Sequence, residues 1–398
     1  MFKVDEKYII NIRREIHEYP EVGFDLPRTI ALVKRELEKF GIPYTEEYGE
    51  SSVVAFINPD KKDFTIGIRA DMDALLIEEK TDLPFKSKIK GQMHACGHDA
   101  HTAMLLGTAK ALKEIEDKIT CRVALVFQPS EEGLRSGAEA LVLGGVMEEI
   151  DVIIGLHIEN WLDSGKIGVC KGESMASSRN FEIEFFGRTA HATLPHTGHD
   201  ALASAVEAYN GIQLMLARKN NPFSKYVCSV GHLSGGTTQN VVADYAKMLG
   251  TIRTFDMSVD EMLITNVRDI ANRAADAFGC RAEVKTDLKA LVVYNNPYIS
   301  DLVLDSAKKV VGEENIAEMP IKMSSEDFSQ YLTKKPGVFI RIGTRNPEKG
   351  CVTLPHNNDF LIDEDAFKNG TALSVQFVLD NMNGIDMEKT YKSDRRVK

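Results

Sequence analysis

Apolar and polar positions follow two different patterns along the first 175 residues. Apolar residues spaced three and four apart predict helices over residues 5–19, 28–41, 100–115 and 136–143. Continuous apolar runs rich in branched side chains predict buried strands over residues 52–57, 64–70, 121–127 and 152–157. Strands that alternate with helices in this way are typical of an α/β domain with a mainly parallel sheet flanked by helices.

The pattern changes near residue 176. Alternating and apolar runs predict strands over residues 181–187, 226–233, 241–255 and 282–293, and amphipathic stripes predict helices over 200–218 and 258–278. This β-α-β-β-α-β order indicates a self-contained α+β two-layer sandwich inserted into the first domain. The α/β pattern of the first domain then returns, with helices predicted at 299–311 and 363–382 and a strand at 338–342.

The predicted organisation is therefore one α/β domain in two parts around an insertion. The α/β domain takes residues 1–176 and 294–398, and the inserted domain takes residues 177–293. A chain of 398 residues exceeds the size at which single cores stop growing, which agrees with two domains. The polar tail after residue 383 is expected to fray.

Charge and composition exclude several classes of protein. The net charge of −11 argues against nucleic acid or an anionic membrane surface as partner. The start lacks the pattern of a signal peptide, and no run of 18 apolar residues predicts a transmembrane helix. Six scattered cysteines without a CxxC pair favour a reducing, cytoplasmic location over a disulfide framework.

The candidate chemistry centres on residues 93–101, MHACGHDAH. A lone histidine is usually structural, but this stretch holds one carboxylate, Asp99, and four metal-capable side chains, His94, Cys96, His98 and His101. In an extended segment Cys96 and His98 would project to the same face, and the glycine between them would allow a tight turn. The stretch therefore predicts a metal site at the start of a helix.

More polar groups lie at or just past the ends of the apolar runs, and such groups gather at one edge of a parallel sheet. Thiolate, imidazole and carboxylate suit zinc or a similar divalent ion. Five of the candidates below, Cys96, His98, Glu132, His157 and His356, could be ligands. Five ligands are too many for one tetrahedral ion with an open position, and they suit two ions that share a ligand. Of two adjacent glutamates, one can bind metal while the other takes a proton from water. The candidates are Asp73, Cys96, His98, Glu131, Glu132, His157 and His356. Read alone, His191, Asn240 and Arg253 in the insertion are structural or surface residues.

Nine motifs occur in an order that resembles a known family: RADMDA, MHACGHDAHTAMLLG, FQPSEEG, GLH, GRTAHATLPHTGHDA, NVVAD, GTIRTF, SSEDF and LPH. The chain resembles dinuclear metallo-amidohydrolases of the aminoacylase/carboxypeptidase type over nearly its whole length. The most similar subgroup contains hippurate hydrolases, auxin–amino-acid conjugate hydrolases and N-acetyldiaminopimelate deacetylases. The resemblance implies a zinc-peptidase-like domain, an inserted lid that forms a homodimer, and two divalent ions per subunit, Mn²⁺, Zn²⁺, Ni²⁺ or Co²⁺.

The resemblance also implies a role for each matched residue. The ligands match Cys96, which bridges, with His98, Glu132, His157 and His356. Glu131 matches the general base, and Asp73 matches the carboxylate that orients the metal site. His191 matches a histidine that reaches a neighbouring subunit's site, and Asn240 and Arg253 match substrate contacts. Family members usually have proline where this chain has Leu76, Asn160, Ala201 and Ala243, and aspartate where it has Arg179.

The expected function is hydrolysis of an N-acyl amino acid to a carboxylate and a free amino acid. A second enzyme hypothesis is a dipeptidase or an N-carbamoyl amino acid hydrolase with the same metal centre. A hypothesis from another class is a non-catalytic, metal-dependent dimer that binds acyl-amino acids. The intact Glu131 counts against the last, because a binding module has no need of a base.

Overall fold

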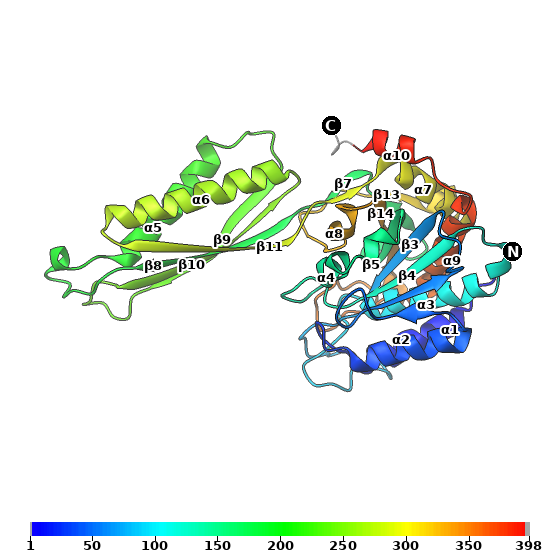
Figure 1. Cartoon of the computed structure of the whole chain (residues 1–398). Helices are drawn as coiled ribbons and strands as arrows, with labels where there is room; N and C mark the ends of the chain where they lie inside the picture. The colour runs from blue at the N-terminus through cyan, green and yellow to red at the C-terminus, as the bar shows by residue number, and fades with distance from the viewer. Residues whose placement is uncertain (1, 395–398) are drawn as a thin grey trace. The chain divides into compact units, whose positions relative to one another are not determined.

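The protein divides into two compact units in a computed structural model that describes residues 2–394 (Figure 1). The larger unit contains the residues up to Ser174, Val293–Ile321 and those from Asp327 onward. The satellite unit contains Met175–Val292 and Lys322–Glu326. Each unit has its own hydrophobic core, so each is described by itself.

The larger unit is built on an eight-stranded sheet with the order β1-β2-β4-β3-β5-β14-β6-β13. The four central strands, β4, β3, β5 and β14, run parallel, whereas β2 and β6 pair antiparallel with their inner neighbours. The strands are β1 (Tyr44–Thr45), β2 (Val53–Ile57), β3 (Thr65–Asp71), β4 (Arg122–Gln128), β5 (Val152–Asp163), β6 (Ile167–Val169), β13 (Ile316–Glu318) and β14 (Gly337–Arg345). A separate two-stranded sheet joins β7 (Gly172–Met175) to β12 (Val293–Asn295).

Helices cover both faces of this sheet. Ile66 and Ile68 of β3 belong to the same buried cluster as α3, whereas Arg69, the residue after Ile68, turns to the other face and pairs with Asp327, just before α8. On the α3 side, α1, α2 and α9 all contact α3, and α7 contacts α9. The helices are α1 (Glu6–His17), α2 (Pro27–Phe40), α3 (His98–Lys113), α4 (Gly137–Leu143), α7 (Pro297–Val311), α8 (Ser329–Leu332), α9 (Phe367–Asn381) and α10 (Met387–Ser393).

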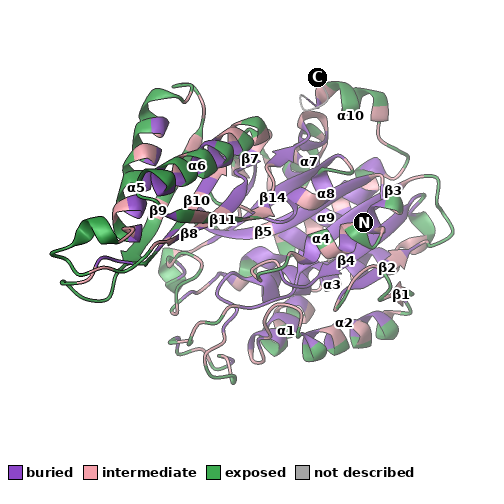
Figure 2. Cartoon of the chain, turned by 60° about the vertical axis from the view of Figure 1, so that its left-hand side comes forward, coloured by how far each residue is buried: buried purple, intermediate pink, exposed green. Residues whose placement is uncertain are grey.

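The satellite unit is a four-stranded antiparallel sheet, ordered β11-β8-β10-β9, with two helices on one face (Figures 1 and 2). Phe181, Ile183 and Met248 point to the helices, and the residues between them carry polar side chains on the other face. This alternation is what an antiparallel sheet with one buried face requires. The elements are β8 (Ser178–Phe186), α5 (Ala201–Arg218), β9 (Tyr226–Gly235), β10 (Tyr245–Thr254), α6 (Met257–Ala277) and β11 (Arg281–Ala290). The predicted fold class, a mainly parallel α/β sheet with an inserted two-layer unit, is confirmed.

Two predictions about elements were wrong. Strand β5 continues to Asp163, well past the apolar run that ends at His157. The tail predicted to fray after residue 383 instead forms α10, because Asp386 caps that helix and the Thr390 carbonyl accepts a hydrogen bond from the Asn296 amide. Residues 395–398 of the tail lie outside the described part. No helix within residues 2–394 is both long and apolar enough to cross a bilayer.

Candidate metal centre

A left-handed turn at Gly97 opens the candidate centre. Gly97 caps α3 with φ 88°, and His98 is the first residue of the helix. A Cβ at position 97 would lie 2.6 Å from Cγ1 of Ile158, so both the backbone conformation and the packing require glycine. The hypothesis that an extended segment aims Cys96 and His98 at one point was therefore wrong. The helix start does this, since its first residue turns back over the preceding loop.

Strand register brings the other segments to the same edge of the sheet. Arg69 pairs with Gly155, so β3 ends at Asp71 on a level with His157 of the neighbouring β5. Asp71 in turn pairs with Gln128, the last residue of β4. The polar groups that follow β3 and β4 therefore lie beside His157, as the parallel sheet predicts.

Asp73 organises the loop after β4. Its two carboxylate oxygens accept hydrogen bonds from the backbone N–H groups of Glu131, at 2.9 Å, and of Glu132, at 3.0 Å. The same carboxylate lies 3.4 Å from Nδ1 of His98. The loop is a bend that begins at Ser130, with φ 51°. One carboxylate thus fixes both glutamates and faces the ring of His98.

The five predicted ligands come together in overlapping groups whose donor atoms lie within 4.8 Å of one another. Cys96 shares one group with His98 and His157 and a second with Glu132 and His356. The Cys96 sulfur is 3.5 Å from Nε2 of His157, and Oε1 of Glu132 is 2.8 Å from Nε2 of His356. A ligand that bridges two ions would belong to both groups, as Cys96 does. A third group joins His98 to Glu131 and Glu132.

Hydrogen bonds set which ring nitrogen of His157 faces the group. Its Nδ1 lies 2.6 Å from the Ile158 carbonyl, which can only accept, so Nδ1 carries the proton and Nε2 is left for a cation. The ring nitrogens of His98 are buried without a hydrogen-bond partner in residues 2–394. Orphaned buried imidazole nitrogens beside a thiol and carboxylates fit zinc or a similar divalent ion.

Two of the four metal-capable residues in the HACGHDAH stretch lie outside the two groups that contain Cys96. Nδ1 of His101 bonds Oδ1 of Asp71 at 2.6 Å, and its Nε2 accepts the Ile158 N–H at 2.9 Å, so both nitrogens are used. His101 therefore supports β5 next to His157. His94 is fully buried, belongs to none of the groups, and burial lowers its pKa to about 3. The i, i+3 spacing of His98 and His101 was the signal that they share a helix face.

The electrostatics of the centre favour a cation. Burial, with Glu132 and Glu131 next, raises the pKa of the Cys96 thiol well above its usual range. Burial alone would lower the pKa of His98, but Asp71 and Asp73 outweigh it and raise that pKa to about 10. Since a ligand must be a thiolate or a neutral imidazole, a bound cation replaces these protons.

Comparison with known proteins identifies the family of this chain. The family model "Peptidase family M20/M25/M40" matches residues 67–380. The chain belongs to this family. It is 39% identical to thermostable carboxypeptidase 1 of Saccharolobus solfataricus, over 94% of this chain and 96% of that protein. It is 34% identical to IAA-amino acid hydrolase ILR1-like 4 of Arabidopsis thaliana, over 98% and 89%. The Bacillus subtilis YXEP protein, described as a dinuclear metal binding peptidase from the M20 family, matches with a TM-score of 0.80 and 31% identity over 96% and 99%.

The other residues to which the sequence resemblance gives a role lie in the satellite unit. His191 forms an isolated bridge with Val241, and the Ala192 N–H donates to the Asn240 carbonyl at 3.0 Å, so the His191 and Asn240 segments lie together. His191 is exposed, and its Nδ1 bonds the Thr193 hydroxyl at 2.8 Å. Arg253 lies apart on β10.

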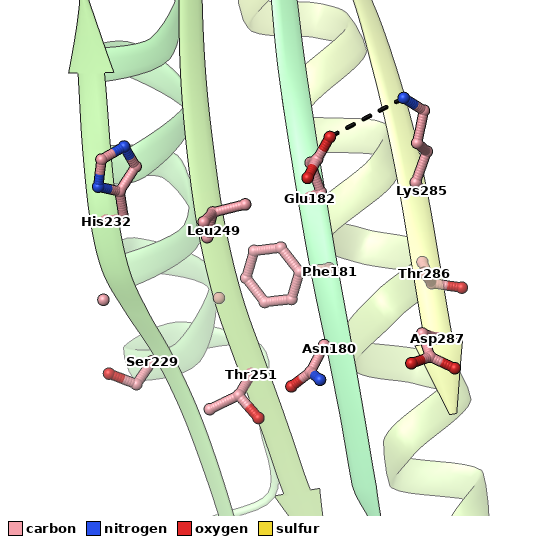
Figure 3. Close-up of a pocket in the computed structure, with 12 residues that line it drawn as sticks. Asn180, Phe181, Glu182, Ser229, His232, Leu249, Thr251, Lys285, Thr286 and Asp287 are labelled. Carbon is pink, nitrogen blue, oxygen red and sulfur yellow. Dashed lines mark ion pairs between the residues drawn. The ribbon is translucent and has the colours of Figure 1, made fainter. Parts of the chain in front are cut away.

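Arg253 lies near a hollow on the polar face of the satellite sheet. A hollow of about 670 Å³ on this face contains the cross-strand pairs Leu249–Glu182 and Thr251–Asn180 (Figure 3). Glu182 at one end is neutralised by Lys285 and Lys247. Two residues beyond Thr251, the half-buried Arg253 donates to the Ser178 hydroxyl, and no carboxylate within residues 2–394 pairs with it.

Some of the departures from the family pattern have local explanations. Arg179 pairs with Asp260 at 2.6 Å and with Glu261, so it ties β8 to α6. The Ala201 N–H donates to the Ala243 carbonyl at 2.9 Å, a bond that proline at 201 could not make. Leu76 is 75% exposed, and nothing in the structure explains its identity.

Proposed function

We propose that the protein is a metal-dependent amidohydrolase that cleaves the amide bond of N-acyl amino acids to a carboxylate and a free amino acid. The observation that carries this proposal is the convergence of five ligands, with Cys96 common to two groups and Glu131 beside them. Relatives named a carboxypeptidase and an IAA-amino acid hydrolase support the same class of reaction. The M20 family supports hydrolysis in general.

Two divalent ions per subunit fit the residues present. One would be held by Cys96, His98 and His157, and the other by Cys96, Glu132 and His356. Thiolate and imidazole ligands favour Zn²⁺, Mn²⁺, Co²⁺ or Ni²⁺ over Ca²⁺ or Mg²⁺. When bound, such a pair supplies Lewis acidity, which polarises the scissile carbonyl and lowers the pKa of water.

The protein's own groups then move the proton. Glu131 is the general base: it takes a proton from the attacking water and delivers it to the leaving nitrogen. Its Oε2 lies 4.0 Å from Nε2 of His98, and Asp73 holds its backbone. The exposed His191 donates a hydrogen bond to the oxyanion in a site of the partner subunit.

Arg253 binds the α-carboxylate of the substrate, and Asn240 binds its carbonyl. A half-buried guanidinium without an acidic partner is suited to an anion from outside, because its planar fork matches two carboxylate oxygens. The cross-strand pair Thr251–Asn180 next to it is uncharged. This supports substrates with a free carboxylate beside the amide.

Assembly as a homodimer through the satellite unit is supported by one flank of that unit. Leu202, Val206 and Tyr209 form an exposed apolar stripe on α5 at helical spacing. A Cβ at Gly211 would contact Ile270 of α6, so the stripe lies on the flank away from α6. That flank also carries β9, the edge strand of the sheet. Apolar stripes and open strand edges are surfaces that a second copy covers. Six free thiols support a cytoplasmic location.

The test separates base from ligand. Glu131→Gln should keep both ions and lose about 10²–10⁴-fold in kcat, the usual range for a positioned base. Glu132→Gln should lower metal content instead, since it removes a charged ligand from one ion. Metal content is measured by mass spectrometry. Activity is measured on N-acetyl, benzoyl, indoleacetyl and carbamoyl amino acids and on dipeptides. Full turnover by protein verified free of metal would refute the proposal.

A further inference from the structure

The buried amide of Asn160 joins two segments that carry metal ligands. Asn160 lies on β5, three residues after His157, and is 1% exposed. Its Nδ2 donates to the carbonyl of Thr353, at 2.7 Å, and to that of Leu361, at 2.6 Å. Both acceptors are backbone carbonyls, so the orientation of the amide is fixed.

The two carbonyls are the ends of the loop that presents His356. Residues 353–361 leave the sheet region and return, and Asn160 bonds both ends at once. The Oδ1 atom of Asn160 is held in turn by the hydroxyl of Thr344 on β14, at 2.7 Å. All three hydrogen bonds that orient the amide are therefore made, and they connect β5, β14 and the loop.

The loop needs such support because its ligand residue has an unfavourable backbone. His356 has φ 66°, a left-handed conformation that a non-glycine residue adopts only when its surroundings enforce it. Inside the loop the His356 N–H donates to the Ala95 carbonyl at 2.8 Å, and the Lys80 N–H donates to the Asn358 carbonyl at 2.7 Å. Asn160 supplies the contacts at the two ends, where the loop could otherwise swing.

We propose that Asn160 is a positioning residue that holds the His356 loop against β5 and thereby sets the affinity of the ion bound by Glu132 and His356. This inference rests on the proposed function for the identity of the ligands. The ion held by His98 and His157 does not use the loop, so it is affected much less. A loss of affinity that is confined to one ion distinguishes a positioning role of Asn160 from a general contribution to folding.

The experiment is a Co²⁺ titration of metal-free protein, followed by visible absorption and by equilibrium dialysis. Asn160→Ala should weaken one of the two ions by about 10–100-fold, the usual effect of removing a group that orients a ligand. Thr344→Val, which removes only the hydroxyl that orients the amide, should weaken the same ion by about 2–10-fold. This second, nearly isosteric variant keeps the test available if Asn160→Ala folds poorly.

Asn295 provides a matched control. It is also fully buried, and its Nδ2 donates to the carbonyls of Cys170 and Phe339, at 2.9 and 3.1 Å, while its Oδ1 accepts the Phe339 N–H at 2.7 Å. Asn295→Ala should lower thermal stability as Asn160→Ala does, yet leave both Co²⁺ affinities unchanged. An equal loss of Co²⁺ affinity in Asn295→Ala would overturn the inference.

A double-mutant cycle completes the test. In a His356→Ala background, where the ligand itself is gone, Asn160→Ala should have no further effect on Co²⁺ binding. Independent, additive losses would overturn the role of Asn160. Failure of the proposed function would look different, because the unaltered protein would then bind Co²⁺ without hydrolysing N-acyl amino acids, or would bind no pair of ions at all.

Discussion

Under the proposed function, the guanidinium of Arg253 determines which group the substrate must carry. Burial lowers the pKa of Arg253, and its only hydrogen-bond partner within residues 2–394 is the Ser178 hydroxyl. A substrate carboxylate would therefore supply the missing counter-charge. A hydrogen bond to a charged group is worth about 1.5–3 kcal/mol, so Arg253→Ala should lose about 10–150-fold in kcat/KM on N-acyl amino acids.

The control for this prediction is the substrate. Arg253→Ala should lose much less kcat/KM on the corresponding amino acid amides, whose carboxylate is already absent. Arg253→Lys keeps the charge but not the fork, so it should recover only part of the loss on the acids. Equal losses on acids and amides would return Arg253 to a structural role.

Side-chain chemistry identified the candidate ligands, but the sequence did not separate ligands from supports. His94, His98 and His101 have the same donor atoms, and only the fold gives His101 the carboxylate of Asp71 and the N–H of Ile158 as partners. The sequence did not identify Asn160 as a positioning residue for a related reason. Its acceptors, Thr353 and Leu361, lie 193 and 201 residues away along the chain, so no local pattern indicates them.

At the scale of elements, the start of α3 is the most demanding point of the centre. Gly97 combines a left-handed φ of 88° with a close approach to Ile158. Gly97→Ala therefore adds backbone strain and overpacking, together about 2–5 kcal/mol in the free energy of unfolding. It should also lower metal content, because the methyl group would push apart the segments that carry Cys96 and His157.

Gly41 is the matched control for Gly97. It ends α2 with φ 67°, and a Cβ there would meet nothing within 4 Å. Gly41→Ala should cost only the strain, about 1–2 kcal/mol, and leave metal content unchanged. Chemical denaturation and metal analysis of both variants give the comparison. Normal metal content in folded Gly97→Ala protein would contradict the proposed role of the turn.

Periodicity predicted most elements because each long strand or helix buries one face, as in the satellite sheet, where Phe181 and Ile183 alternate with polar residues. It failed where tertiary contacts decide. Strand β5 outruns its apolar stretch because β14 continues to pair with it, as at Gly343 and Glu159. The His98 turn was interpreted as extended because i, i+2 spacing also fits a strand, and the sequence alone does not reveal the clash with Ile158.

At the scale of the whole molecule, the proposed functional residues come from both units and from two subunits. The metal ligands and Glu131 belong to the larger unit, and His191, Asn240 and Arg253 belong to the satellite unit. Most homodimers have two-fold symmetry, so in the proposed dimer each subunit would both lend and receive the same residue. The proposed homodimer therefore has a consequence that isolated subunits would not show.

Mixing two inactive variants tests that consequence. Glu131→Gln removes the base, and His191→Ala removes the proposed oxyanion donor, so neither homodimer should turn over at more than a small fraction of the normal rate. In a mixed dimer, one site combines the intact Glu131 of one subunit with the intact His191 of the other. An equal mixture after subunit exchange should then recover about a quarter of normal activity, since half of the dimers are mixed and each has one working site. If His191 served its own subunit, every site in the mixture would lack one of the two residues. No recovery after exchange verified by mass spectrometry would therefore place His191 within its own chain or outside the reaction.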